Sequence, residues 1–124
     1  MLENAIPVTL LNASDPGSLR EFYEDVLGLG FLSEDPGGVV FSLGSGVLRI
    51  LKSSGAQEKR EPVLSWKVTD IGLLASKLRS KGVEPIPMPC FENGENGICI
   101  SKSAKHFFFC DPSGNLLSLI EPFR

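Results

Sequence analysis

The chain has 124 residues, which is enough for one compact domain or for two small modules. Its hydrophobic content of 42% and charged content of 22% are typical of a globular protein and exclude disorder or a fibrous repeat. A net charge of −3 without any run of Lys and Arg argues against a nucleic-acid partner. No apolar run approaches the roughly 18 residues that a membrane-spanning helix needs, so no membrane partner is expected.

The N-terminal stretch MLENAIPVTLL has no basic segment and carries an acid at Glu3. Such a stretch does not resemble an export signal, and we therefore predict a cytoplasmic location. Cys90, Cys99 and Cys110 are an odd number of cysteines with no close C-x-x-C pair. In a reducing compartment we expect all three to be free thiols.

The first half of the chain predicts a strand, a helix and three further strands. Val8 to Ala13 should form the first strand, and Asp15-Pro16 has the chemistry of a helix start. A stripe of apolar residues at helical spacing then predicts about three turns, which Gly28 ends. The stripe consists of Leu19, Phe22, Tyr23, Val26 and Leu27. The next strands are expected near Phe31, over Val39 to Leu43 and over Val47 to Leu51, with the last two joined by a Gly44-Ser45-Gly46 hairpin.

The second half repeats this order. A strand over Val63 to Val68 precedes a helix that Asp70 can cap and Gly82 ends. The apolar stripe of that helix consists of Ile71, Leu74, Ala75 and Leu78. The later strands are expected over Val83 to Ile86, near Ile98 to Ile100, over Phe107 to Cys110 and over Leu116 to Ile120. Asp111-Pro112-Ser113-Gly114-Asn115 has the residues of a sharp turn between the last two strands.

This repetition predicts an α+β fold built from two βαβββ modules, residues 1–55 and 60–124, joined by a short polar linker. A module of this size cannot bury both faces of its sheet alone. We therefore expect the two modules to form a cupped mixed sheet with a concave cleft, where a ligand would bind.

Several motifs resemble those of the vicinal-oxygen-chelate superfamily, which includes glyoxalase I, extradiol dioxygenases, fosfomycin-resistance proteins and bleomycin-resistance proteins. The motifs are Asp15…Phe22-Tyr23…Leu27-Gly28, Val68-Thr69-Asp70 and Phe109-Cys110-Asp111-Pro112-Ser113-Gly114-Asn115-Leu116. The resemblance runs from about Ala5 to Pro122 and implies that residues 1–124 form one domain of that fold. Because several reactions and binding roles share the fold, the motifs alone do not name an activity.

The resemblance also implies where metal ligands would lie. Enzymes of the superfamily usually hold a divalent metal with four side chains, and these positions fall on Val8 (or Pro7), Arg49, Val63 and Ser118. Aliphatic side chains, a guanidinium and a neutral hydroxyl are poor donors for a dication. His106 is the only histidine and precedes a strand, where a partly exposed polar residue is common. We therefore predict no metal, no cofactor and no catalytic residue.

The cleft should instead offer apolar side chains with a few polar groups. Arg49 and Lys67 would favour an anionic ligand, although the amine of Lys67 can also reach water. Phe91, at the tip of the loop PIPMPCFENGENG, and Phe107 could stack on an aromatic ligand, whereas Trp66 is expected in the core. The predicted ligand-binding residues are Asn12, Arg49, Ser65, Lys67, Phe91, His106, Phe107 and Ser118.

The leading hypothesis is a metal-independent small-molecule-binding protein of the glyoxalase/bleomycin-resistance type that acts by sequestration in the cleft between the modules. The resemblance also implies a homodimer. The alternative is a metal-dependent lyase, isomerase or dioxygenase-like enzyme with relocated ligands, for which His106, Cys110, Asp111 and Glu121 would have to converge. A third possibility is a regulatory module with a vestigial pocket.

Overall fold

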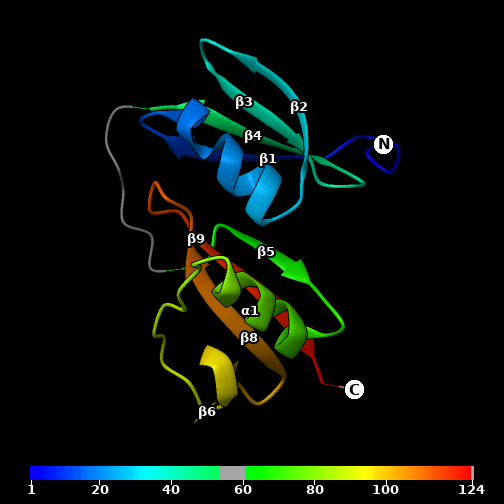
Figure 1. The fold of residues 1–124 in the computed structure, drawn as a ribbon. Helices are drawn as coiled ribbons and strands as arrows, with labels where there is room; N and C mark the ends of the chain where they lie inside the picture. The colour runs from blue at the N-terminus through cyan, green and yellow to red at the C-terminus, as the bar shows by residue number, and fades with distance from the viewer. Residues whose placement is uncertain (54–60, 124) are drawn as a thin grey trace. The chain divides into compact units, whose positions relative to one another are not determined.

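The computed structural model describes residues 1–53 and 61–123, and the chain divides into two compact units, Met1–Glu58 and Lys59–Arg124 (Figure 1). We refer to them as unit 1 and unit 2 and describe each by itself. Most of the predicted polar linker around residues 53–61 lies outside the described residues. The described residues form an α+β fold with one mixed sheet in each unit, as the sequence predicted.

Unit 1 contains a four-stranded sheet in the order β1-β4-β3-β2, in which β1 runs parallel to β4 and the other neighbours are antiparallel. A helical segment, η1 and η2, lies along one face of this sheet (Figure 1). The elements are β1 (Val8–Ala13), η1 (Pro16–Leu19), η2 (Phe22–Val26), β2 (Gly30–Asp35), β3 (Gly38–Ser42) and β4 (Val47–Lys52). The strands therefore agree closely with those predicted from the sequence.

The helical segment of unit 1 is less regular than its apolar stripe predicted. Pro16 occupies the first turn, as expected, but the Asp15 carboxylate makes no capping hydrogen bond, and its backbone carbonyl accepts the Ser18 N–H instead. Further along, the Leu27 N–H donates to the Phe22 carbonyl, five residues back, which is the wide spacing of a π-turn. Gly28 then ends the segment with a φ of 78°, as predicted.

Aromatic side chains of the helical segment and the sheet pack against one another. Tyr23 is fully buried, with its ring 5.4 Å from that of Phe41 on β3. Phe31 on β2 meets the same Phe41 ring edge-on at 6.0 Å. Leu48 and Ile50 of β4 are also fully buried. These side chains form the core of unit 1, between its helical segment and its sheet.

Unit 2 contains a five-stranded sheet in the order β5-β9-β8-β7-β6, in which β5 runs parallel to β9 and the other neighbours are antiparallel. Helix α1 lies across one face of this sheet (Figure 1). The elements are β5 (Leu64–Lys67), α1 (Ile71–Ser80), β6 (Glu92–Asn93), η3 (Glu95–Gly97), β7 (Cys99–Ile100), β8 (Ala104–Cys110) and β9 (Leu116–Pro122). The buried side of the sheet holds Phe107, Phe109 and Leu117 against Ile71 and Ala75 of the helix.

Helix α1 ends at Gly82, which has a positive φ as predicted, but it begins differently. Asp70 lies at the N-cap position without a side-chain capping bond. The first helical N–H, that of Ile71, donates instead to Glu121 Oε1 on β9 at 2.8 Å. A carboxylate distant in sequence therefore satisfies a backbone donor that the nearby Asp70 leaves open.

The turn between β8 and β9 has the predicted structure. Asp111, which is 4% exposed, accepts the backbone N–H groups of Ser113 and Asn115 through Oδ1, each at 2.9 Å. Its Oδ2 accepts the Asn115 side-chain amide, and Gly114 has a φ of 96°. Asp111 therefore holds the turn together through several hydrogen bonds at once.

The expected strand over Val83 to Ile86 does not form. In this segment the Ile86 N–H bonds to the Phe108 carbonyl at 2.7 Å, but Pro85 and Pro87 on either side have no N–H to continue a ladder. A two-residue strand, β6, which the sequence did not predict, pairs with β7 instead.

The prediction of three free thiols is also wrong. Cys90 and Cys99 form a disulfide, and of the three cysteines Cys110 alone stays free. The two cysteines are nine residues apart, a separation that matches no known cysteine motif. The bridge depends on the turn that brings the two segments together. In the described part of the chain, every helix is too short or too polar to cross a membrane.

Candidate functional site

Unit 1 has one sheet face that its helical segment does not cover, which we call open face 1. Side chains alternate along β1, so that Leu11 and Ala13 are buried while Val8 and Leu10 are 55% and 59% exposed. The register places Val8 beside Val47, Leu10 beside Arg49 and Asn12 beside Leu51. Open face 1 is therefore mostly aliphatic, with Arg49 and Asn12 as its polar groups. These are the residues that strand alternation predicted.

Arg49 on open face 1 has an acidic partner that the sequence analysis did not identify. Its guanidinium nitrogen lies 3.5 Å from each carboxylate oxygen of Asp35 on β2. The pKa of Asp35 is lowered mainly by the Gly37 N–H that its carboxylate accepts, and Arg49 adds to the effect. Asp35 thus partly balances the charge of Arg49, and an anionic ligand would have to compete with it.

The corresponding uncovered face of unit 2, open face 2, centres on two hydroxyl groups. Ser118 is only 3% exposed, and its Oγ lies 2.6 Å from the Oγ of Ser65 on the neighbouring strand. Leu117 and Leu119, on either side of Ser118, are buried on the opposite face. The polar residue within this apolar strand therefore joins β9 to β5 through a hydrogen bond between side chains.

An aromatic pair lies beside the two hydroxyls. Phe108 is opposite Ser118 in the strand register, and its ring stacks on His106 with centroids 5.4 Å apart and planes 10° apart. His106 Nε2 lies 3.1 Å from Ser101 Oγ. Burial lowers the pKa of His106, which favours the neutral ring near pH 7. Strand alternation could have identified Phe108, since it shares the parity of His106, but the sequence analysis chose Phe107.

The other predicted ligand-binding residues of unit 2 lie in different surroundings. Lys67 is exposed at the end of β5. Phe91 is 72% exposed, and the Lys102 amine lies 5.9 Å from its ring centroid. Phe107 is fully buried, with its ring 5.7 Å from that of Phe109, so its assignment to the ligand site does not fit the structure. Trp66 is half-buried opposite Leu119 rather than fully enclosed.

The residues at the positions of the family's metal ligands do not suit a divalent cation. Val8 and Val63 have no donor atom, the Arg49 guanidinium is a cation paired with Asp35, and the Ser118 hydroxyl is bonded to Ser65. Within residues 1–53 and 61–123, no group of three His, Cys, Asp or Glu side chains could hold a metal ion.

The four residues that a relocated metal site would need already have other contacts. Glu121 accepts the Ile71 N–H, and Asp111 accepts the N–H groups of the β8–β9 turn. His106 contacts Ser101 and Phe108. The pKa of the Cys110 thiol is raised by burial and by the Asp111 charge, which disfavours the thiolate that metals bind. The structure does not bring these four residues together as a ligand set.

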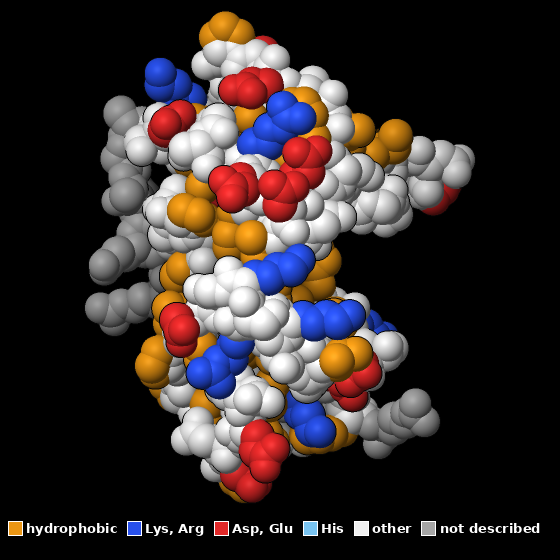
Figure 2. Space-filling view, viewed as in Figure 1, with side chains coloured by type: hydrophobic (Ala, Val, Ile, Leu, Met, Phe, Trp, Pro, Cys, Tyr) orange, Lys and Arg blue, Asp and Glu red, His pale blue; other side chains and the backbone are white. Residues whose placement is uncertain are grey.

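The outer surface gives no sign of a nucleic-acid footprint on the side shown in Figure 2. There, acidic side chains gather over the helical segment of unit 1, and the Lys and Arg side chains of unit 2 are separated from one another. One of the acids in the helical segment, Glu24, pairs with Arg20 at 3.3 Å. Described residues on this side therefore form no continuous basic stripe of the kind that binds phosphates.

Comparisons with known proteins give a consistent result. Residues 5–119 match the family model described as the Glyoxalase/Bleomycin resistance protein/Dioxygenase superfamily. A glyoxalase family protein of Enterococcus faecalis has a similar structure, with a TM-score of 0.70, 25% identity and coverage of 98% of this chain and 100% of that one. No curated protein sequence matches the chain.

Two further similar structures have different roles. TnmS3, an antibiotic binding protein from a Streptomyces species, gives a TM-score of 0.66 at 18% identity, with 99% of each chain covered. FosX, a fosfomycin resistance protein of Listeria monocytogenes, gives 0.71 at 14% identity, with 96% of this chain and 91% of that one covered. At such identities the likeness concerns the fold alone.

Proposed function

The chain belongs to the glyoxalase/bleomycin resistance protein/dioxygenase superfamily, and from this premise we propose that it binds a small molecule without a metal and acts by sequestration. The observation that carries the proposal is the chemistry of open faces 1 and 2. They present aliphatic, aromatic and hydroxyl groups where the resemblance leads one to expect metal ligands. No bond of the ligand would be made or broken.

The open faces favour an aromatic or largely apolar ligand with one polar or anionic group. Val8 and Leu10 lie beside Arg49 on open face 1, and Phe108 and His106 lie beside Ser118 on open face 2. Apolar surface with a few placed polar groups is the usual lining of a small-molecule site. Because Asp35 partly balances Arg49, a strongly anionic ligand fits less well than a neutral or singly charged one.

A ligand of this kind agrees with the role of one similar structure, that of an antibiotic binding protein. In this proposal Asn12 and Arg49 provide the polar contacts of open face 1, and Ser65, Lys67 and His106 provide those of open face 2. Ser118, which is 3% exposed, holds the Ser65 hydroxyl, and Phe91 lies at the periphery. Phe108 replaces Phe107 as the stacking residue, because Phe107 is buried in the core.

Thermal-shift screening with a panel of aromatic antibiotics, with and without EDTA, tests this function. We expect a subset to raise the unfolding temperature and EDTA to change nothing. Leu10→Glu, which puts a charge on open face 1, should abolish the shift. Leu73→Glu is the matched control, because Leu73 is 51% exposed on helix α1 and lies on neither open face.

The alternative of a metal-dependent enzyme predicts a different result with EDTA and a positive metal analysis. Metal analysis of protein purified without chelator would find about one equivalent of Zn, Mn, Ni or Fe, and EDTA would remove the ligand-induced shift. That pair of results would overturn sequestration in favour of a metal-dependent lyase, isomerase or dioxygenase. The similarity to FosX, named as a fosfomycin resistance protein, makes fosfomycin a useful member of the panel.

A homodimer and a cytoplasmic location remain parts of the proposal. Sedimentation equilibrium of the full chain should give twice the monomer mass. A cytoplasm would keep the Cys90–Cys99 pair reduced, since its glutathione and thioredoxin pools reduce most disulfides. Thiol labelling of protein taken directly from cells should then modify both cysteines; an intact bridge would argue against this location.

A further inference from the structure

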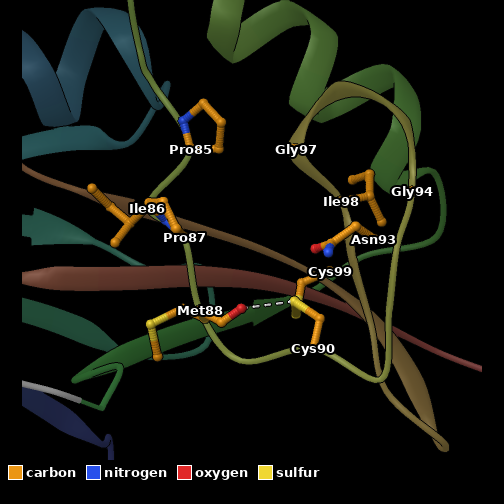
Figure 3. Close-up of a pocket in the computed structure, with 10 residues that line it drawn as sticks. All are labelled: Pro85, Ile86, Pro87, Met88, Cys90, Asn93, Gly94, Gly97, Ile98 and Cys99. Atoms are coloured by element: carbon orange, nitrogen blue, oxygen red, sulfur yellow. Dashed lines mark hydrogen bonds between the residues drawn. A yellow bond between two sulfur atoms is a disulfide. The ribbon is translucent and has the colours of Figure 1, made fainter.

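A cavity of about 210 Å³ lies in unit 2 (Figure 3). One wall is the proline-rich segment 85–88, and the other is the hairpin that contains β6, η3 and β7. The lining residues are Pro85, Ile86, Pro87, Met88, Cys90, Asn93, Gly94, Gly97, Ile98 and Cys99. None of them is among the residues assigned to the proposed function above.

Backbone contacts hold both walls of this cavity. The Ile86 N–H donates to the Phe108 carbonyl, which ties the proline-rich wall to strand β8. Opposite, the Gly94 N–H donates to the Ile98 carbonyl at 2.8 Å, which closes the hairpin. Gly97 has a φ of 79°, and a Cβ there would lie 2.6 Å from the Pro85 ring. Only a glycine at position 97 allows this close approach, so the sequence specifies the spacing of the walls.

The Cys90–Cys99 bridge joins the two walls covalently. Cys90 follows the proline-rich wall and Cys99 belongs to β7, and their Cα atoms are 5.5 Å apart. The carbonyl oxygens of Met88 and Pro89 lie 3.0 Å from Cys90 Sγ and 3.8 Å from Cys99 Sγ. In the bridged form neither sulfur carries a proton, so the covalent bond and not a thiol hydrogen bond restrains the walls.

The lining indicates the class of molecule that would fit. It contains no charged side chain, so an ion would lose hydration without compensation. Proline rings, the Met88 thioether and the disulfide sulfurs form good contacts with aromatic rings. A cavity of about 150 Å³ can hold benzene, so this one has room for a substituted or fused ring.

One polar group is available to orient such a ring. The Asn93 side-chain amide points from the hairpin toward the proline-rich wall (Figure 3). This side-chain amide makes no hydrogen bond with any residue that the structure describes. Its amide can donate to or accept from a single polar atom of the bound ring.

We propose that unit 2 binds one small, uncharged aromatic molecule in this cavity, and that in the oxidised chain the Cys90–Cys99 bridge holds the walls at the spacing of tightest binding, so that a reducing cytoplasm would weaken the binding by opening the bridge. This site goes beyond the proposed function, because it uses a different set of residues and does not depend on what the open faces bind.

Titration of the ¹⁵N-labelled full chain with indole tests the proposal. We expect saturable shifts of the Gly94, Gly97, Ile98 and Cys99 amide signals and much weaker binding of the anion indole-3-acetate. Shifts confined to Ser65 and Ser118 would place indole on open face 2 and overturn the proposal, while leaving the proposed function intact. Absence of any shift at millimolar indole would also overturn it.

Matched variants separate the cavity from the rest of unit 2. Asn93→Trp fills the cavity and should abolish the indole shifts. Phe123→Trp introduces the same side chain at an exposed position of unit 2 outside the lining, and should leave indole binding unchanged. Equal behaviour of the two variants would contradict the proposed site.

The role of the bridge is tested by reduction and by Cys90→Ala/Cys99→Ala. Freeing the walls adds conformational entropy that binding must then remove, so affinity for indole should fall about tenfold or more. Dispersed Phe107 and Leu117 signals show in each case that the sheet remains folded. Unchanged affinity for indole after reduction, or unfolding of the sheet on reduction, would contradict the proposal that the bridge restrains only the walls of the cavity.

Discussion

In each unit a first strand is followed by a helical segment and then by further strands, three in unit 1 and four in unit 2, yet the units secure their helices by different means. In unit 1 the helical segment is irregular, and the Tyr23 ring anchors it to Phe41 on the sheet. In unit 2 the helix is regular, and its first N–H is held by Glu121 from the last strand. The comparison shows that the topology needs a helix fixed against the sheet but does not dictate whether packing or a hydrogen bond fixes it.

The open faces of the units also differ, in the charge of their polar contacts. On open face 1 the polar contact is a charged pair, Arg49 with Asp35, and the Asp35 side chain is about half exposed. On open face 2 it is the neutral pair of Ser65 and Ser118, with Ser118 buried. A neutral hydroxyl costs less desolvation than a charged group, which fits the burial of Ser118 and the exposure of Asp35.

The largest effect is expected where unit 1 depends on packing. Phe41→Ala removes a fully buried ring that contacts Tyr23 and Phe31, and should lower the free energy of unfolding by about 3–5 kcal/mol. Urea unfolding followed by circular dichroism measures this loss. Phe91→Ala, at an exposed ring, is the control and should change stability by about 0.5 kcal/mol or less. Similar losses for both variants would contradict the account of the core.

The next effect concerns the hydrogen bond that starts helix α1. Glu121→Ala leaves the Ile71 N–H without its acceptor and should cost about 1–2 kcal/mol in urea unfolding. Glu121→Gln keeps an oxygen acceptor and should recover much of this stability. Asp70→Ala should cost about 0.5 kcal/mol or less, because Asp70 makes no capping bond. A larger cost for Asp70 than for Glu121 would reverse the assignment of the cap.

A smaller effect is expected for the hydroxyl pair of open face 2. In a double-mutant cycle, Ser65→Ala and Ser118→Ala should show a coupling of about 0.5–1.5 kcal/mol, since either substitution breaks the same hydrogen bond. Thermal or urea unfolding of the four proteins gives the value. Strictly additive losses would indicate that the two hydroxyls bond to water rather than to each other.

The smallest effect is a pH dependence from His106. Burial lowers its pKa in the folded state below the usual value of 6.5, so the unfolded chain takes up the proton first as the pH falls. Stability should therefore be full above pH 6.5 and decrease below it, until the folded-state pKa is passed. His106→Gln should flatten this part of the profile. An NMR titration that gives His106 a pKa above 6.5 would contradict the prediction.

The sequence predicted the elements that depend on local chemistry. Residue periodicity and glycine positions located nearly every strand and both helix ends, and Gly28, Gly82 and Gly114 all have the positive φ that these sites require. The Asp111 turn could also be predicted from the sequence, because all its hydrogen bonds lie within five residues.

Contacts between residues far apart in the sequence could not be predicted from the sequence. Asp35 with Arg49, Glu121 with Ile71 and Cys90 with Cys99 each depend on strand register or on the path of a turn. For the candidate site, alternation placed Leu10, Asn12 and Arg49 on one face of the sheet, as the register has them, and their binding of a ligand stays a prediction. Alternation was misapplied at Phe107, because it places Phe108, and not Phe107, on the same face as His106.

The parallel pairing of the first and last strands has a consequence for synthesis. Ser65 on β5 and Ser118 on β9 are 53 residues apart, so β5 leaves the ribosome long before its only sheet partner exists. The same delay, over a shorter stretch, applies to β1 and β4. Each unit must therefore wait for its final strand before it can close, and during that wait the unpaired first strand is exposed to other nascent chains.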